Sequence, residues 1–454
     1  MTNDLTKGTV FKKILLFSIP FLLGNMFQQL YNVVDMVIVG RAIDSTAYAA
    51  VGSTGSLVWF ASGAVQFLTA GLSVITAQNF GKGDIEGVKK SFAQSIKIAA
   101  IVSVFLAVLT VIFARPMLEL LKTPDDLVER AYKYIVWIFA GLVATALYNI
   151  LSNMLRALGD SKSSLYFLVI ACGINIVLDI LFIAAFKMDT DGAGLATVIA
   201  QLISGICCIF YIKKKHPHLH LEKRHFARDT SLVKSLLKVA IPMMFLNMVL
   251  SVGGIAVQFA TNSLGTNYVL AQTTAYKVEN FVTLPLFAFG PTVSMFVAQN
   301  YGAGKYDRVI EGTRAVMLID IIWCVFSVIA MYFLGKPLVR LLAGDIPQDV
   351  VENAFIYIMI IVGTSIILAA VHVYKCMLQA IGRTFWTTVS GFSEILGRAG
   401  VSFLALALMA AGTITEYQAF IMICFAGPAA WLLGYLTFLP EYLIISKKFR
   451  KGSL

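Results

Sequence analysis

Four polar side chains inside apolar segments have the types and spacing to bind a cation. Asp35 lies within the apolar run at 22–40, LLGNMFQQLYNVVDMVIVG, and Asp179 lies within another, CGINIVLDILFI. Asn175 precedes Asp179 by four residues and shares its face if the segment is a helix. Thr197 adds a hydroxyl in a third apolar segment. Two carboxyls, an amide and a hydroxyl could hold a bare Na⁺, or the two carboxyls could share a proton.

Other polar residues of the first apolar run are weaker candidates. Gln28 and Asn32 fall on the same helical face as Asp35. Together with Tyr31, they could form the wall of a cleft for a solute. For Asn25 we favour a simple hydrogen bond between helices, which is a common role of amides in membrane segments.

The second half of the chain carries different acids in its apolar segments. Glu279 could face a cavity or pack structurally, and no role is predicted for Asp320. Glu394 lies four residues before Arg398 on one helical face, which predicts a structural ion pair. The first half is therefore the better candidate for coupling to an ion.

The composition indicates a membrane protein with many spans. Of its 454 residues, 58% are hydrophobic and only 13% are charged, whereas soluble domains carry about 25% charged residues. A spanning helix needs about 20 apolar residues. No cleavage pattern follows the first apolar run, so we expect that run to remain as a helix. The predicted fold is all-α, with twelve transmembrane helices near 14–39, 50–78, 92–114, 132–155, 165–186, 193–212, 236–262, 268–299, 314–334, 353–378, 386–411 and 417–445.

The chain also repeats itself at an offset of about 222 residues. AQNFGKGD at 77–84 recurs as AQNYGAGKYD at 298–307, and SIPFLLGN at 18–25 recurs as AIPMMFLN at 240–247. Each half holds an even number of spans, so the halves have the same orientation and form a parallel repeat of two six-helix bundles. The expected organisation is an N-terminal six-helix lobe, a cytoplasmic linker and a C-terminal six-helix lobe, at 1–212, 213–235 and 236–454.

The net charge of +11 follows the expected topology. Lys and Arg gather at both termini, in the linker and in alternate loops, and such loops are normally cytoplasmic. We therefore expect a multi-pass protein of the plasma membrane with both termini in the cytoplasm. The basic loops would attract anionic membrane lipids, and nucleic-acid binding is not expected.

A repeated G-x-G motif suggests turns rather than a nucleotide site. It occurs at Gly81 and Gly83, and again at Gly302 and Gly304. Neither copy has the GxxxxGK[ST] pattern or the preceding strand of a phosphate-binding loop. The motif predicts tight cytoplasmic turns, and the chain does not resemble an ATP-driven pump.

The linker contains four histidines, which could bind a metal ion. A solvated linker is the simpler interpretation of this polar segment. The four are His216, His218, His220 and His225.

Four motifs follow one another along the chain, namely NVVDMVIVG at 32–40, AQNFGKGD at 77–84, NMLRALGDSK at 153–162 and NIVLD at 175–179. Together they resemble the motifs of the multidrug and toxic compound extrusion (MATE) family, and most closely those of its DinF-like branch. The resemblance implies a MATE/MOP-like fold and secondary antiport by alternating access. In such antiport H⁺ or Na⁺ enters while an organic, often cationic and drug-like, solute leaves.

The resemblance also implies roles for single residues. It places the coupling carboxylate at Asp35, with Asn175, Asp179 and Thr197 in the same H⁺ or Na⁺ site, and it assigns bending of the first helix to Pro20. The acids that the sodium-coupled branch keeps in its seventh and tenth helices have no equivalent here. The expected partners are small organic solutes and membrane lipids. We expect a monomer without a cofactor and with no metal other than Na⁺.

Three other functions deserve comparison with antiport. A flippase for a lipid-linked precursor would need a basic cavity to hold pyrophosphate, and apart from Lys277 and Arg398 few cations lie at membrane depth. A channel or receptor would not require duplicated lobes with acids inside the helices. An enzyme is not expected, because no nucleophile–base pair or metal constellation occurs.

Overall fold

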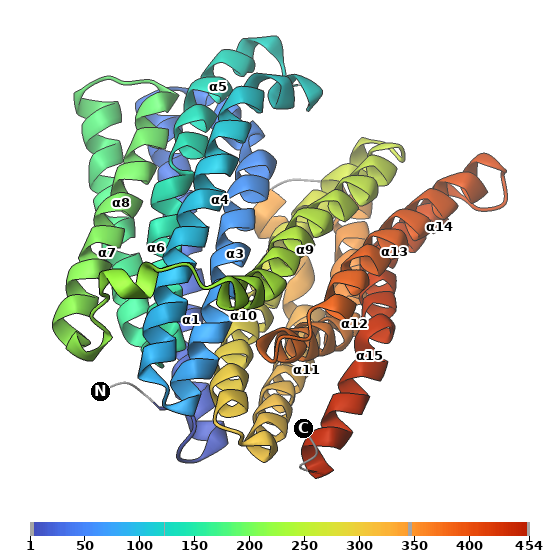
Figure 1. The fold of residues 1–454 in the computed structure, drawn as a ribbon. Coiled ribbons are helices and arrows are strands. Elements are labelled where there is room, and N and C mark those ends of the chain that lie inside the picture. Colours follow the sequence, from blue (N-terminus) through green and yellow to red (C-terminus); the bar gives the residue numbers. More distant parts are fainter. Residues whose placement is uncertain (1–3, 122, 344–346, 452–454) are drawn as a thin grey trace. The chain divides into compact units, whose positions relative to one another are not determined.

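The computed structural model describes residues 4–121, 123–343 and 347–451, which contain helices and no strand (Figure 1). The α-helices are α1 (Val10–Ala42), α2 (Ser45–Ser53), α3 (Gly55–Lys82), α4 (Ile85–Leu120), α5 (Asp125–Ala140), α6 (Leu142–Ala157), α7 (Ser161–Asp179), α8 (Thr190–Lys215), α9 (Thr230–Asn262), α10 (Thr266–Gly302), α11 (Tyr306–Ala343), α12 (Gln348–Ala380), α13 (Phe385–Ala410), α14 (Glu416–Cys424) and α15 (Ala426–Lys451). A π-helical turn, η1 (Ile180–Ala185), follows α7. Two 3-10 turns, η2 (Pro217–Leu219) and η3 (Lys223–Phe226), lie in the linker.

Within the described part of the chain, eleven helical segments are long and apolar enough to cross a membrane. Helices α5 and α6 meet at a bend of 45°, and they make a twelfth span if they cross together. Helices α14 and α15 together form the last span. The prediction of an all-α membrane protein is confirmed, with eleven or twelve spans in the described residues where twelve were predicted.

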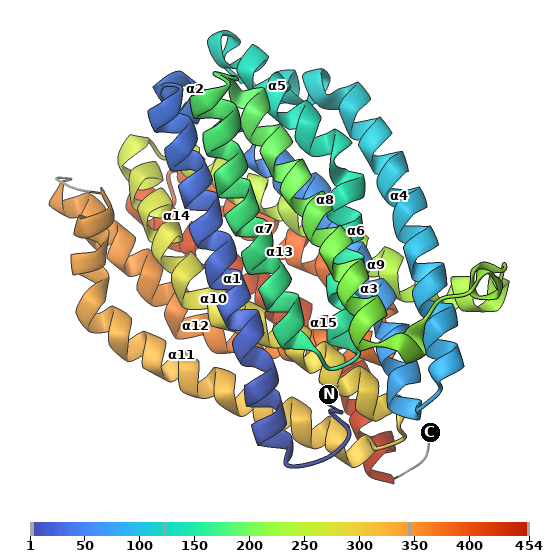
Figure 2. The same cartoon turned by 90° about the vertical axis from the view of Figure 1, so that its left-hand side faces the viewer.

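The chain divides into two compact units. Unit 1 comprises Met1–Gly8, Leu15–Asn247 and Ala298–Lys305, and unit 2 comprises Thr9–Ile14, Met248–Val297 and Tyr306–Leu454. In unit 1, α3 packs against α4 and α6, and α8 packs against α5, α6 and α7. Helices α1, α7 and α8 of this unit lie side by side (Figure 2). In unit 2, α11 packs against α12, and α13 packs against α15.

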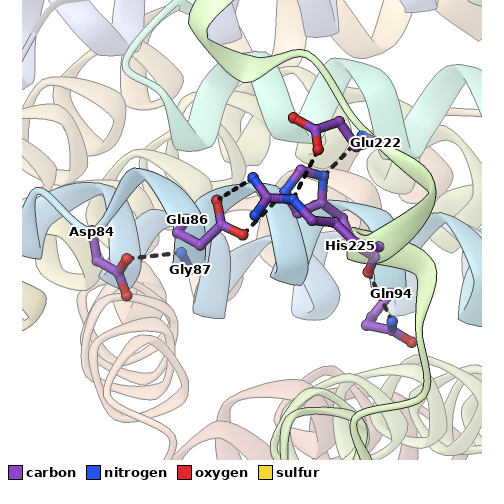
Figure 3. A network of polar contacts seen from close by, with 7 residues as sticks. Asp84, Glu86, Gly87, Gln94, Glu222 and His225 are labelled. Carbon is purple, nitrogen blue, oxygen red and sulfur yellow. Dashed lines mark hydrogen bonds and ion pairs between the residues drawn. The ribbon is translucent and has the colours of Figure 1, made fainter.

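The linker folds onto unit 1 through η3. His225 is only 1% exposed. Its Nε2 lies 3.1 Å from Glu86 Oε1 on α4, and its Nδ1 accepts a hydrogen bond from the backbone N–H of Glu222 (Figure 3). Gln94 donates from Nε2 to the carbonyl oxygens of His225 and Ala227. The expectation of a solvated linker is therefore wrong at His225, because α4 supplies partners for this turn.

A second linker histidine, His216, is also buried. The ring of His216 packs edge-on against that of Tyr211 on α8, whereas the side chain of His218 lies outside the described ones. In the parts of the chain that the structure describes, no three His, Cys, Asp or Glu side chains converge as metal ligands would.

The two glycines of each G-x-G motif have different structural roles. Gly83 and Gly304 end their helices in the left-handed conformation, with φ of 76° and 68°, which other residues adopt only at a cost. Gly81 and Gly302 lie inside the last turns of α3 and α10. A Cβ on Gly81 would overlap the backbone carbonyl of Gln299, and one on Gly302 would overlap that of Gln78. The motif thus combines a turn with a close approach between the two helices.

Candidate ion-coupling site

Three helices of unit 1 supply the predicted coupling residues. Helix α1 carries Tyr31 and Asp35 one turn apart, α7 carries Asn175 and Asp179 one turn apart, and α8 carries Thr197. Asp179 is the last residue of α7, and the π-helical turn η1 follows it directly. Turns of this kind are rare and are frequently found at functional sites.

The carboxyls of Asp35 and Asp179 lie close enough to interact electrostatically with each other. Two ionised carboxylates so close together would repel each other, so a proton bound to one of them would stabilise the pair. Asp35 is 6% exposed and Asp179 is fully buried. Among the described residues, neither Oδ1 atom has a hydrogen-bond partner. The pair therefore keeps two oxygen atoms with which a proton or a cation could interact.

Asn175 and Thr197 surround the acid pair with further polar atoms. In the orientation that satisfies all its neighbours, the Asn175 amide donates from Nδ2 to Asp179 Oδ2 at 2.8 Å. Its oxygen accepts from the Thr197 N–H at 3.2 Å and from the Thr197 hydroxyl at 3.3 Å. The hydroxyls of Tyr31 and Thr197 lie 3.1 Å apart. Tyr134 on α5, which the sequence did not single out, is close enough to interact electrostatically with both carboxyls.

A cavity of about 170 Å³ lies within unit 1 next to these residues. Five residues predicted from the sequence line it, namely Pro20, Gln28, Tyr31, Asn175 and Thr197. The predicted cleft residue Asn32 is exposed and does not line this cavity. The other polar side chains of the lining are Asn25, Ser62, Gln66, Thr145, Tyr148, Asn149, Arg156, Ser161, Ser164 and Gln201.

Arg156 brings a positive charge to this cavity. Its Nε donates to the Ser164 hydroxyl at 2.9 Å, and its Nη2 donates to the Ser152 hydroxyl at 2.8 Å. The guanidinium also lies over the ring of Phe21, 5.0 Å from the centroid. Arg156 takes part in none of the salt bridges between described residues.

Two lining residues show what the sequence could and could not reveal. Gln201 follows Thr197 by four residues and faces the same cavity, a spacing that could have identified it. Arg156 stands three residues before the glycine of a basic loop, so sequence reasoning counted it with the loop charges. Its position in the cavity depends on how α6 packs against α7 and α8.

The acids of the second half have partners on other helices. Glu394 on α13 pairs with Lys375 on α12, with Nζ and Oε1 2.5 Å apart. The predicted pair with Arg398 is therefore wrong, because a neighbouring helix brings a lysine to Glu394 that spacing within one helix cannot reveal. Glu279 on α10 is half-buried and accepts a hydrogen bond from the Tyr357 hydroxyl at 3.1 Å.

Comparison with known proteins decides the family. A family model described as MatE matches residues 20–181 and 242–404, which together make up most of the chain. The chain belongs to the MatE family. This MATE chain matches the model twice, with the two matches about 222 residues apart, in agreement with the internal repeat. The family consists of multidrug efflux transporters, so the chain is a membrane transporter rather than an enzyme.

Relatives of known name or structure cover most of the MATE chain. The probable multidrug resistance protein YpnP of Bacillus subtilis (strain 168) is 30% identical over 75% of this chain and 76% of its own length. YoeA of the same organism, also a probable multidrug resistance protein, is 27% identical over 87% of both chains. A crystal structure of MATE in the bent conformation has a TM-score of 0.88, at 19% identity, and 98% of each chain is covered. That structural likeness supports the fold alone.

Proposed function

We propose that this MATE chain is a secondary antiporter that exports small organic solutes, often cationic and drug-like, in exchange for inward H⁺ or Na⁺. The names of its relatives, which include multidrug resistance and multidrug export proteins, support this class of solute. The distribution of Lys and Arg supports a plasma-membrane location with both termini and the 213–235 linker in the cytoplasm. We further propose that it acts as a monomer among membrane lipids, and we assign it to the DinF-like branch on its motifs.

The buried pair of Asp35 and Asp179 carries this proposal. An ionised carboxylate inside a membrane protein is costly unless a cation, a proton or water compensates it. Binding of the coupling ion therefore favours a conformation in which the pair is dry, and its release favours one in which water reaches the pair. The closeness of the two carboxyls supports a proton as the ion held in the present conformation, because two ionised carboxylates would repel each other.

Bending of α1 at Pro20 is the proposed link between ion binding and solute release. Proline lacks the N–H that would bond to the preceding turn, so a helix bends most easily there. Pro20 is buried and lines the same cavity as Tyr31, Asn175 and Thr197. A change in the packing of Asp35 against α7 would therefore alter the shape of the cavity through α1.

Transport by the purified protein in liposomes tests the function directly. We expect efflux of a fluorescent organic cation such as ethidium when a pH gradient or a Na⁺ gradient is imposed, and the effective gradient identifies the ion. Asp35→Asn should abolish the gradient-driven part of the efflux. Asp126→Asn, which changes an exposed carboxylate in the first turn of α5, is the matched control and should transport as the wild type does. Gradient-driven efflux at the wild-type rate by Asp35→Asn would overturn the assignment.

A further inference from the structure

Unit 2 contains a buried carboxyl, that of Asp320, which the coupling mechanism does not use. Asp320 lies near the middle of α11, in a segment apolar enough to span the membrane. The residue is completely buried. Neither Oδ1 nor Oδ2 has a hydrogen-bond partner in the described part of the structure. Glu279 and Glu394, by contrast, each have a donor on a neighbouring helix.

The surroundings of Asp320 are nearly free of charge. Cys324 follows one turn later on the same face of α11, and its thiol lies next to the side chain of Ser365 on α12. This face of α11 therefore packs against α12. The Cys324 thiol is the one titratable group that interacts with Asp320 among the described residues, and no Lys, Arg, His or other carboxyl does so. The hydroxyl of Ser327, two turns along α11, is likewise buried, and it has no hydrogen-bond partner among the described residues.

The internal repeat shows that the fold does not require an acid at this position. Helices α4 and α11 begin at Ile85 and Tyr306 and carry matching prolines at 116 and 337, so they correspond residue by residue. In this register Asp320 matches Ala99, which is buried in α4. A small apolar side chain thus suffices in the first repeat, and packing alone does not explain a carboxyl in the second.

We propose that Asp320 is a second proton-binding site, carried by unit 2, which holds H⁺ in this conformation and returns it to water in another. An ionised carboxylate without a partner in an apolar interior would be far too costly, whereas the protonated acid is neutral. Metal cations take several ligands, and in the described part of the chain Asp320 belongs to no cluster of three His, Cys, Asp or Glu side chains, so we assign H⁺ rather than Na⁺ to this site. If the chain exports solutes by ion exchange, as proposed above, Asp320 would add one H⁺ to each transport cycle. This role in transport rests on the proposed function.

Labelling with a hydrophobic carbodiimide tests proton occupancy without transport. Such reagents modify protonated carboxyls that are shielded from water. In the full-length wild type we expect mass mapping to find label at Asp320 at neutral pH, to lose most of it in alkaline buffer, and to find no protection by Na⁺. Absence of label at neutral pH, label that does not change with pH, or protection by Na⁺ would each overturn the proposal.

A stoichiometry measurement tests the role of this proton in transport. With the membrane potential held at zero and a gradient of about one pH unit, each coupled H⁺ contributes about tenfold to the solute ratio reached at steady state. Asp320→Asn should lower that ratio about tenfold, and Ser327→Ala, which removes a neighbouring hydroxyl but no titratable group, should leave it unchanged. An unchanged ratio in Asp320→Asn would overturn the proposal. If Asp35→Asn transported normally, the proposed function would fail, yet the labelling result for Asp320 would still be decisive.

Discussion

The hydroxyl of Tyr31 on α1 lies 3.1 Å from the hydroxyl of Thr197 on α8. Because Thr197 also bonds to Asn175, and Asn175 bonds to Asp179, a chain of hydrogen bonds runs from α1 through α8 to the acid on α7. The electrostatic interaction between Asp35 and Asp179 links α1 to α7 a second time. A network of polar interactions thus connects the three helices, so that a change in the protonation of one acid affects the contacts of all three.

Removal of the Tyr31 hydroxyl should weaken this network of polar interactions without abolishing it. We expect Tyr31→Phe to lower the free energy of unfolding by about 1 kcal/mol, the usual contribution of one hydrogen bond. Ion-driven efflux should slow by about fivefold, far less than in Asp35→Asn, because both carboxyls remain. Thermal unfolding in detergent and flux in liposomes measure the two effects.

The matched variant is Thr197→Val, which removes the other hydroxyl of the same contact. The double variant should cost less than the sum of the two single ones, because the residues share one interaction. Strict additivity of the three values would show that the contact between Tyr31 and Thr197 contributes nothing.

The close approach at the repeated glycines makes a second prediction. Gly81→Ala and Gly302→Ala each place a methyl group against a backbone carbonyl that cannot move aside. We expect each to lower the free energy of unfolding by about 1–3 kcal/mol, as overpacking usually does. The control is Gly173→Ala in α7, where no atom lies within 4 Å of the new Cβ, and where alanine should stabilise the helix by up to about 1 kcal/mol. Equal effects at the three positions, measured by unfolding in detergent, would refute the interpretation.

Much of the fold could be predicted from the sequence, because the lengths of its apolar segments and its internal repeat can both be recognised there. The spans follow from runs of apolar residues, and the repeated AQN motifs set the register between the halves. The bend between α5 and α6 was not predicted, since a single apolar run at 132–155 covers both sides of Gly141. The packing of His225 against Glu86 was also not predicted, because a polar linker gives no sign of what it will contact.

The candidate site was predictable where the signal lay within one helix. The spacing of Asn175 and Asp179 placed them on one face, and the cost of burying a carboxyl marked Asp35. Partners that come from another helix left no such signal. Tyr134 on α5 interacts electrostatically with the acid pair, and Lys375 on α12 pairs with Glu394. Neither interaction has a characteristic spacing along the chain.

The pair of Lys375 and Glu394 provides a third prediction, about stability in unit 2. The two side chains are 9% and 4% exposed, so truncation of one leaves the other as an unpaired buried charge. We expect Lys375→Met to lower the free energy of unfolding by about 3–5 kcal/mol. The double variant Lys375→Met and Glu394→Met should recover to within about 1 kcal/mol of the wild type, since it buries no charge. A double variant as unstable as the single one would contradict this account, and unfolding in detergent measures both.

Asp44 provides a prediction about pH, because it lies outside the spanning segments. The backbone N–H of Ala47, and next the guanidinium of Arg130, hold the pKa of this carboxyl below its ordinary value of 3.8. Asp44 caps α2, with Oδ1 2.7 Å from the Ala47 nitrogen, and its two oxygens lie 2.7 and 2.8 Å from Arg130 Nη1. A carboxyl whose pKa is lower in the folded state stabilises that state at pH values above the unfolded pKa. The contribution is lost as pH falls through the folded value.

Asn is a good substitute for Asp as a helix cap, so Asp44→Asn should keep the bond to Ala47 and lose only the charge opposite Arg130. The variant should therefore unfold at a lower temperature than the wild type at neutral pH. The difference should shrink as pH falls below 3.8, because the wild-type carboxyl then becomes neutral as well. Thermal unfolding of both proteins in detergent between neutral and acidic pH measures the difference. A difference that persists unchanged in acid would show that the charge of Asp44 does not support the contact with Arg130.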